Sequence, residues 1–180
     1  MWLFAYGSLI FRPGFAFQRR VRGYVEGFER RFWQVSTDHR GTPESPGRVV
    51  TLVSVPGARC WGVAYELSDA DFERYVAHLD VRERNGYDRI ALPFVAQDRQ
   101  VTGVLSAVAY IAPAGNPHFG GELPLPELAD IIRASSGPSG HNAEYILSLA
   151  EALAALDVED AHVFELANWV SDPAAAATDD

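Results

Sequence analysis

The sequence predicts an α+β fold, because segments typical of β-strands come early in the chain and segments typical of helices are gathered late. One helical segment interrupts the strands, but strands and helices do not alternate as they do in a parallel α/β protein. The chain has 180 residues, a length that suits one domain with a sizeable core. We therefore expect a single domain over residues 1–172, followed by a disordered tail over residues 173–180.

The expected strands are short runs rich in β-branched and aromatic residues, and glycine or proline bounds most of them. They cover residues 1–5, 21–28, 48–54, 60–67, 89–94 and 101–111. The sequence SVPG at residues 54–57 predicts a turn between the third and fourth strands, because proline and glycine favour turns.

The expected helices are recognised by start signals and apolar faces. The first begins after Ser68, which can cap it together with Asp71. Its apolar face consists of Phe72, Tyr75, Val76 and Leu79. The second has Pro126 in its first turn, and we expect residues 137–138 (Gly-Pro) to end it. The remaining helices are expected over residues 142–156 and 160–170.

The composition excludes several classes of protein. The net charge of −9 and the pI of about 5.0 argue against nucleic acid and anionic membranes as partners. There is no run of about 18 apolar residues, so we expect no transmembrane helix, and we expect no secretory signal. Cys60 is the single cysteine, which prevents an internal disulfide and fits a reducing compartment. We therefore expect a cytoplasmic protein.

The fifteen basic residues are all arginine. The absence of lysine excludes Schiff-base chemistry and a Walker-type phosphate site. The histidines show no metal-ligand spacing, so we expect no metal site. Cys60 lies beside Trp61 in an apolar run, which favours a buried structural thiol over a nucleophile.

Residues 2–10, with the sequence WLFAYGSLI, are the most informative stretch. A short apolar strand ends at Gly7, which lets the backbone approach a ligand closely, and Ser8 adds a hydroxyl at the same point. A turn of this kind can offer N–H groups to an anion or to a carbonyl oxygen. An ordinary tight turn is the alternative that these residues leave open.

Further motifs follow this stretch along the chain. They are residues 31–34, 36–41, 46–52, 61–65 and 79–83 with Gly86 and Tyr87, and residues 137–140 with Asn142, Glu144 and Tyr145. In this order and spacing, the set resembles the ChaC-type, glutathione-specific γ-glutamylcyclotransferases. The resemblance runs from Met1 to about Val170. Ala5 departs from the pattern, which has a glycine before Tyr-Gly-Ser-Leu, and this difference concerns the shape of the loop more than the activity.

The resemblance implies a γ-glutamylcyclotransferase-like mixed β-barrel with flanking helices and a substrate cavity at one end. It also implies a lyase that converts glutathione to 5-oxoproline and Cys-Gly without a cofactor, by attack of the γ-glutamyl α-amine on the γ-carbonyl. Two alternatives remain. The chain could act on other γ-glutamyl amino acids or amines, or it could be a non-catalytic domain that binds a small ligand.

Glu83 matches the proton-transfer glutamate of the family, so the resemblance implies that it is the catalytic residue. Local sequence alone favours an exposed glutamate paired with Arg82 or Arg84. Neighbouring positive charge lowers the pKa of a carboxyl group, whereas a proton shuttle works best with a raised pKa. Burial of Glu83, with both arginines directed toward solvent, would reconcile the two.

The resemblance also implies a set of substrate-binding residues. The loop is expected to hold the γ-glutamyl unit through its backbone N–H groups and the Ser8 hydroxyl. The expected binding residues are Ala5, Tyr6, Gly7, Ser8, Leu9, Ile10, Tyr110 and Tyr145. For Tyr145, a place in the hydrophobic core is the alternative.

Overall fold

The computed structural model describes residues 1–82, 86–98 and 101–172. The chain divides into two compact units. The first, the barrel unit, comprises Met1–Arg30 and Leu52–Pro117, and the second, the helical unit, comprises Arg31–Thr51 and His118–Asp180. Each unit is formed by two separate stretches of the chain. The expectation of a single domain over residues 1–172 stays a prediction, and the expected disordered tail lies outside the described residues.

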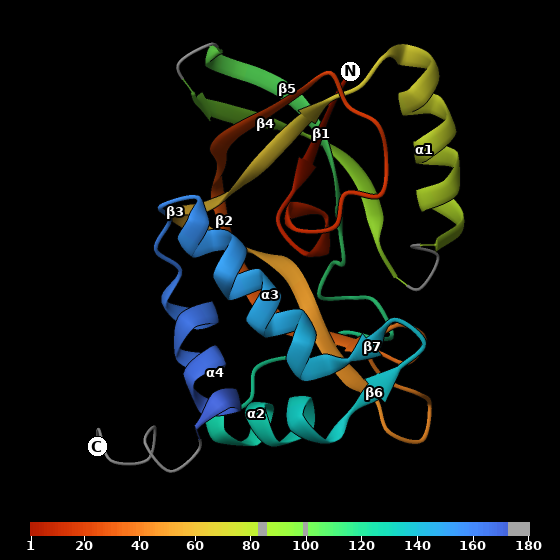
Figure 1. Ribbon diagram of the computed structural model, residues 1–180, viewed down its shortest axis with the longest axis vertical. Helices are drawn as coiled ribbons and strands as arrows, with labels where there is room; N and C mark the ends of the chain where they lie inside the picture. Colours follow the sequence, from red (N-terminus) through yellow and green to blue (C-terminus); the bar gives the residue numbers. More distant parts are fainter. Residues whose placement is uncertain (83–85, 99–100, 173–180) are drawn as a thin grey trace. The chain divides into compact units, whose positions relative to one another are not determined.

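The sheet is a closed barrel with the strand order β1-β3-β2-β4-β5 (Figure 1). The strands are β1 (Trp2–Ala5), β2 (Arg19–Ser36), β3 (Gly47–Glu66), β4 (Asp88–Gln97) and β5 (Thr102–Ile111). Strand β1 is antiparallel to β3 and parallel to β5, so the barrel is mixed. The predicted α+β class and mixed barrel are confirmed.

The barrel core is formed by aromatic and small side chains from neighbouring strands. The rings of Phe4 on β1 and Phe94 on β4 lie 5.5 Å apart, and both are almost completely buried. Small residues let the strands approach each other at fixed points. A Cβ atom on Gly23 of β2 would lie 2.2 Å from the carbonyl oxygen of Val95 on β4, so only glycine fits at this position.

The predicted turn at residues 54–57 is wrong, because β3 continues through this segment from Gly47 to Glu66. Pro56 and Gly57 are exposed, and Gly57 takes a φ of +81°. A glycine in the left-handed region allows a strand to bend or bulge while it stays in the sheet. Strand β2 also contains a glycine with a positive φ, Gly27, at +80°. It extends to Ser36, well beyond the predicted end at residue 28.

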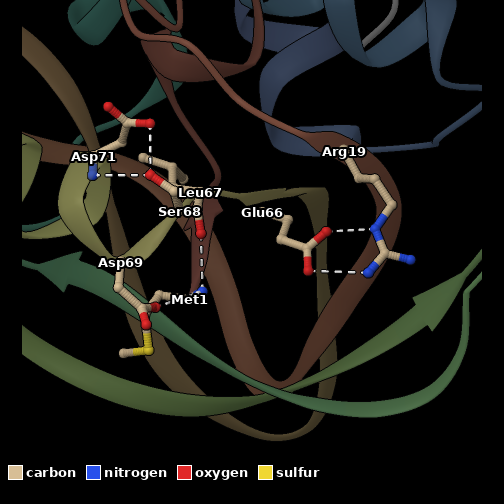
Figure 2. A network of polar contacts seen from close by, with 7 residues as sticks. All are labelled: Met1, Arg19, Glu66, Leu67, Ser68, Asp69 and Asp71. Atoms are coloured by element: carbon tan, nitrogen blue, oxygen red, sulfur yellow. Dashed lines mark hydrogen bonds and ion pairs between the residues drawn. The ribbon is translucent and has the colours of Figure 1, made fainter.

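Helix α1 (Asp69–Arg82) begins as predicted. The Ser68 hydroxyl oxygen accepts a hydrogen bond from the Asp71 backbone N–H at 3.1 Å, and the hydroxyl donates to the Asp71 carboxylate at 2.7 Å. The N-terminal amine of Met1 donates to the Leu67 carbonyl oxygen at 3.0 Å (Figure 2). These contacts join the first residue of the chain to the start of α1.

The helical unit contains α2 (Leu125–Ala134), α3 (Asn142–Ala155) and α4 (Ala161–Ser171), which pack against one another. Helix α4 is capped by the Asp160 carboxylate, which accepts a hydrogen bond from the Val163 N–H at 3.1 Å. Helix α2 ends at Ala134, earlier than predicted. The Gly137-Pro138 segment instead belongs to a small hairpin of β6 (Ser136–Gly137) and β7 (Gly140–His141). This hairpin was not predicted from the sequence.

We expect Gly23→Ala to lower the free energy of unfolding by at least about 2 kcal/mol, because the added methyl group would meet the Val95 carbonyl oxygen and the Phe94 ring. The midpoint of thermal unfolding should fall by roughly 5 °C or more. Gly115→Ala is the matched control, since a Cβ atom there would meet no heavy atom within 4 Å. Equal midpoints for the two variants would contradict the close approach of β2 and β4.

Candidate active site

The candidate binding loop follows directly from β1, which ends at Ala5. Gly7 precedes a short 3₁₀ helix, η1 (Ser8–Ile10), in which the N–H of Ile10 donates to the Gly7 carbonyl oxygen at 3.0 Å. The N–H of Arg12 donates to the Ser8 carbonyl oxygen at 2.8 Å. Ala5, Tyr6 and Ile10 are buried, whereas residues 7–9 are half-buried. The middle of the loop is therefore the part that a ligand can reach.

A buried arginine holds the start of the loop. Arg30 on β2 is only 1% exposed. Its Nε donates to the Tyr6 carbonyl oxygen at 2.6 Å, and its Nη2 donates to the Trp61 carbonyl oxygen on β3. The guanidinium thereby joins the loop to two strands of the barrel. This role was not predicted from the sequence, because Arg30 lies in a charged run, Glu29-Arg30-Arg31, beyond the predicted end of the strand at residue 28.

A buried tyrosine holds the end of the loop. The Tyr65 hydroxyl on β3 donates to the Leu9 carbonyl oxygen at 2.9 Å and accepts a hydrogen bond from Arg20 Nε at 3.3 Å. Burial raises the pKa of Tyr65, and Arg20 partly opposes this shift. The hydroxyl therefore stays protonated, and remains a donor to the loop, beyond the pH at which a solvated tyrosine ionises.

The anchors described above use the carbonyl oxygens of the loop and leave N–H groups available. Within the part of the chain that the structure describes, no residue accepts a hydrogen bond from the N–H of Gly7, Ser8 or Leu9. The Ser8 hydroxyl is also without a partner among these residues. Such a concentration of donors suits a carboxylate or a polarised carbonyl oxygen. The turn therefore has the donors that the binding interpretation requires.

Tyr110 lies beside this loop. The Tyr6 hydroxyl donates to the Tyr110 carbonyl oxygen at 2.5 Å, and the Tyr110 hydroxyl donates to the Val76 carbonyl oxygen in α1 at 3.3 Å. The structure thus brings together the loop, β5 and α1. Of the predicted binding residues, Ala5 to Ile10 and Tyr110 belong to one connected group in the barrel unit.

Tyr145 belongs to the helical unit, where it is 5% exposed. Its ring lies 5.7 Å from that of Phe32, and the Arg40 guanidinium lies 5.5 Å above it. These contacts are typical of a core tyrosine. A role for Tyr145 in lining the substrate cavity stays a prediction.

Asn142 and Arg48, which belong to two other motifs of the helical unit, are joined by hydrogen bonds. Asn142 is fully buried. Its side-chain Oδ1 accepts a hydrogen bond from the Arg48 N–H at 2.6 Å, and its Nδ2 donates to the Arg48 carbonyl oxygen at 2.8 Å. Burial lowers the pKa of the Arg48 guanidinium. Asn142 thus joins the start of α3 to β3, which gives these motifs a structural role.

Glu83, the predicted catalytic residue, lies outside the described residues. It is the next residue in sequence after Arg82, the last residue of α1. In the described ranges, no group of three histidine, cysteine, aspartate or glutamate side chains is placed to hold a metal ion. Cys60 is a buried thiol, as predicted. No helix in the described part of the chain is long and apolar enough to cross a membrane.

A closed mixed barrel together with several helices places the chain in the α+β class of proteins. Comparison with known proteins narrows this class, because residues 1–173 match the family model described as ChaC-like protein. The chain belongs to the ChaC-like family. The resemblance predicted from the sequence is thereby confirmed.

Relatives in this family are similar over most of their length. Gamma-glutamylcyclotransferase 2-3 from Arabidopsis thaliana is 42% identical over 94% of this chain and 88% of its own. Glutathione-specific gamma-glutamylcyclotransferase 1 from Homo sapiens is 40% identical over 94% of this chain and 78% of its own. A crystal structure of a γ-glutamyl cyclotransferase from yeast that is specific to glutathione has a TM-score of 0.89, with 30% identity over 95% of both chains.

We expect Arg30→Met to lower the free energy of unfolding by about 2 to 4 kcal/mol, because two buried carbonyl oxygens would lose their donor. Chemical denaturation measures this change. Arg19→Met is the matched control, since Arg19 is an exposed arginine paired with Glu66 at the barrel surface (Figure 2), where an ion pair stabilises little. The anchoring role of Arg30 would be wrong if the two variants lost the same stability.

Proposed function

We propose that this chain is a glutathione-specific γ-glutamylcyclotransferase, which converts glutathione to 5-oxoproline and Cys-Gly. One observation carries the proposal. Relatives named for this activity in Danio rerio and Homo sapiens are 41% and 40% identical over 92% and 94% of the chain. The loop at residues 6–10 supports it, because its N–H groups suit the carboxylate of a γ-glutamyl unit. We further propose a single catalytic domain in the cytoplasm.

The substrate supplies its own nucleophile in the proposed reaction. The α-amine of the γ-glutamyl unit attacks the γ-carbonyl carbon, a five-membered ring closes, and the bond to the cysteine nitrogen breaks. Holding the substrate in a folded conformation can contribute about 7–11 kcal/mol, because the reacting groups are already in one molecule and only need orientation. The loop would supply this orientation through the N–H groups of residues 7–9 and the Ser8 hydroxyl. This scheme requires no metal or other cofactor.

Proton transfer is the remaining task, and we assign it to Glu83. The ammonium group must lose a proton before it attacks, and the departing cysteine nitrogen must gain one. One carboxyl group near both nitrogens can perform the two transfers in turn, which contributes roughly 10²–10⁴-fold. The contacts that lead from Tyr6 through Tyr110 to Val76 connect the loop with α1, and Glu83 follows that helix in sequence. This connection supports the assignment.

We expect Glu83→Gln to reduce kcat at least about 10²-fold, because an amide keeps the size and hydrogen-bonding capacity of the side chain but transfers no proton. The assay measures 5-oxoproline formed from glutathione. Glu73→Gln, an exposed position on α1, is the matched control and should retain full activity. Near wild-type turnover by the Glu83 variant would overturn the assignment.

N-acetyl-glutathione should not be cleaved, because acetylation draws the lone pair of the α-amine into an amide and removes the nucleophile. Unmodified glutathione should give 5-oxoproline as the first product, detected by mass spectrometry. Free glutamate as the first product, or release of N-acetylglutamate, would mean that water is the nucleophile. A parallel assay with γ-Glu-Ala and γ-glutamyl amines separates glutathione-specific activity from a broader activity.

A further inference from the structure

An open cleft of about 590 Å³ lies next to the loop, within the barrel unit. Its lining comes from the segment after η1 and from one face of α1. The lining residues are Arg12, Pro13, Gly14, Phe15, Ala16, Asp71, Arg74 and Tyr75. None of the roles assigned so far uses this cleft.

Two walls of the cleft are tied to the loop by contacts. The N–H of Arg12 donates to the Ser8 carbonyl oxygen at 2.8 Å. The Phe15 ring lies 5.2 Å from the ring of Tyr65, whose hydroxyl donates to the Leu9 carbonyl oxygen at 2.9 Å. The cleft and the loop are therefore joined through Arg12 and through Tyr65.

The cleft carries a surplus of positive charge, although the chain as a whole has a net charge of −9. Asp71 is an ion-pair partner of Arg74 and also accepts a hydrogen bond from the Ser68 hydroxyl. Arg12 is exposed, and its guanidinium forms no hydrogen bond or ion pair with any described residue. One guanidinium group is thus available to an incoming anion, and its planar donors suit a carboxylate.

Another part of the cleft lining is aromatic and uncharged. The rings of Phe15 and Tyr75 pack against each other with centroids 4.3 Å apart, and the Tyr75 hydroxyl donates to the Pro13 carbonyl oxygen at 3.4 Å. An aromatic surface of this kind binds apolar groups and is favourable for sulfur. The cleft therefore combines a surface for a thiol-bearing side chain with a cation for a carboxylate.

These features match the part of glutathione that the loop does not hold. We propose that the cleft receives the cysteinylglycine portion, with the cysteine side chain against Phe15 and Tyr75 and the glycine carboxylate paired with Arg12. Two extended residues span roughly 7 Å, and Arg12 of the cleft is bonded through its N–H to the Ser8 carbonyl oxygen of the loop. This inference rests on the proposed function and makes Arg12 the residue that distinguishes glutathione from γ-glutamyl compounds without a terminal carboxylate.

The test compares kcat/KM for glutathione with that for its glycinamide analogue, which differs only in the terminal charge. The wild-type chain should prefer glutathione by on the order of tenfold, as expected for one charge-assisted contact at a partly solvated site. Arg12→Gln should bring this ratio close to one, mainly through a higher KM for glutathione. Arg59→Gln is the matched control, because Arg59 is an exposed arginine of the same unit outside the cleft, and it should keep the wild-type ratio.

A second measurement does not depend on turnover. Isothermal titration of the whole chain with the dipeptide Cys-Gly should show binding that Arg12→Gln weakens by a similar factor. An active enzyme with equal kcat/KM for glutathione and the glycinamide, or an Arg12 variant that keeps the wild-type ratio, overturns this inference and leaves the proposed function intact. Failure to convert any γ-glutamyl compound overturns both.

Discussion

The hydrogen bonds of the buried Arg30 guanidinium are the interaction on which the candidate site depends. They join the Tyr6 carbonyl oxygen on the loop to the Trp61 carbonyl oxygen on β3. A buried cation is costly to desolvate, and removing its partners is costlier still. Both carbonyl oxygens must therefore remain in place as long as the barrel is folded. The beginning of the loop is fixed by the core of the protein, whereas its middle, residues 7–9, is half-buried.

This constraint determines which backbone groups of the loop form hydrogen bonds with the barrel. Arg30 and Tyr65 occupy carbonyl oxygens at its two ends, and the Tyr6 hydroxyl contacts β5. The N–H groups of residues 7–9 are left without an acceptor among the described residues. Such preorganised donors need no rearrangement when negative charge arrives. Ala5, the departure from the family pattern, is buried at the last position of β1, before these donors begin.

Much of the architecture could be predicted from local signals. The Ser68 cap, the start of α4 after Asp160 and most strands follow from residue type and spacing. Local signals failed where tertiary context decided the outcome. Gly57 takes a positive φ inside β3, and the strand continues through the predicted turn to Glu66. The candidate binding loop was predicted from Gly7 and Ser8, but its anchors, Arg30 and Tyr65, are distant in sequence, and only the folded barrel brings them to it.

Tyr65 also has a consequence for the order of events after ring closure. Its hydroxyl contacts the loop that would hold 5-oxoproline, and its ring contacts Phe15 in the cleft that would hold Cys-Gly. The two products then share one rigid side chain between their sites. By thermodynamic reciprocity, if bound 5-oxoproline changed the affinity for Cys-Gly through Tyr65, bound Cys-Gly would change the affinity for 5-oxoproline by the same factor. Under the two proposed assignments, departure of the dipeptide would then be coupled to release of the cyclic product.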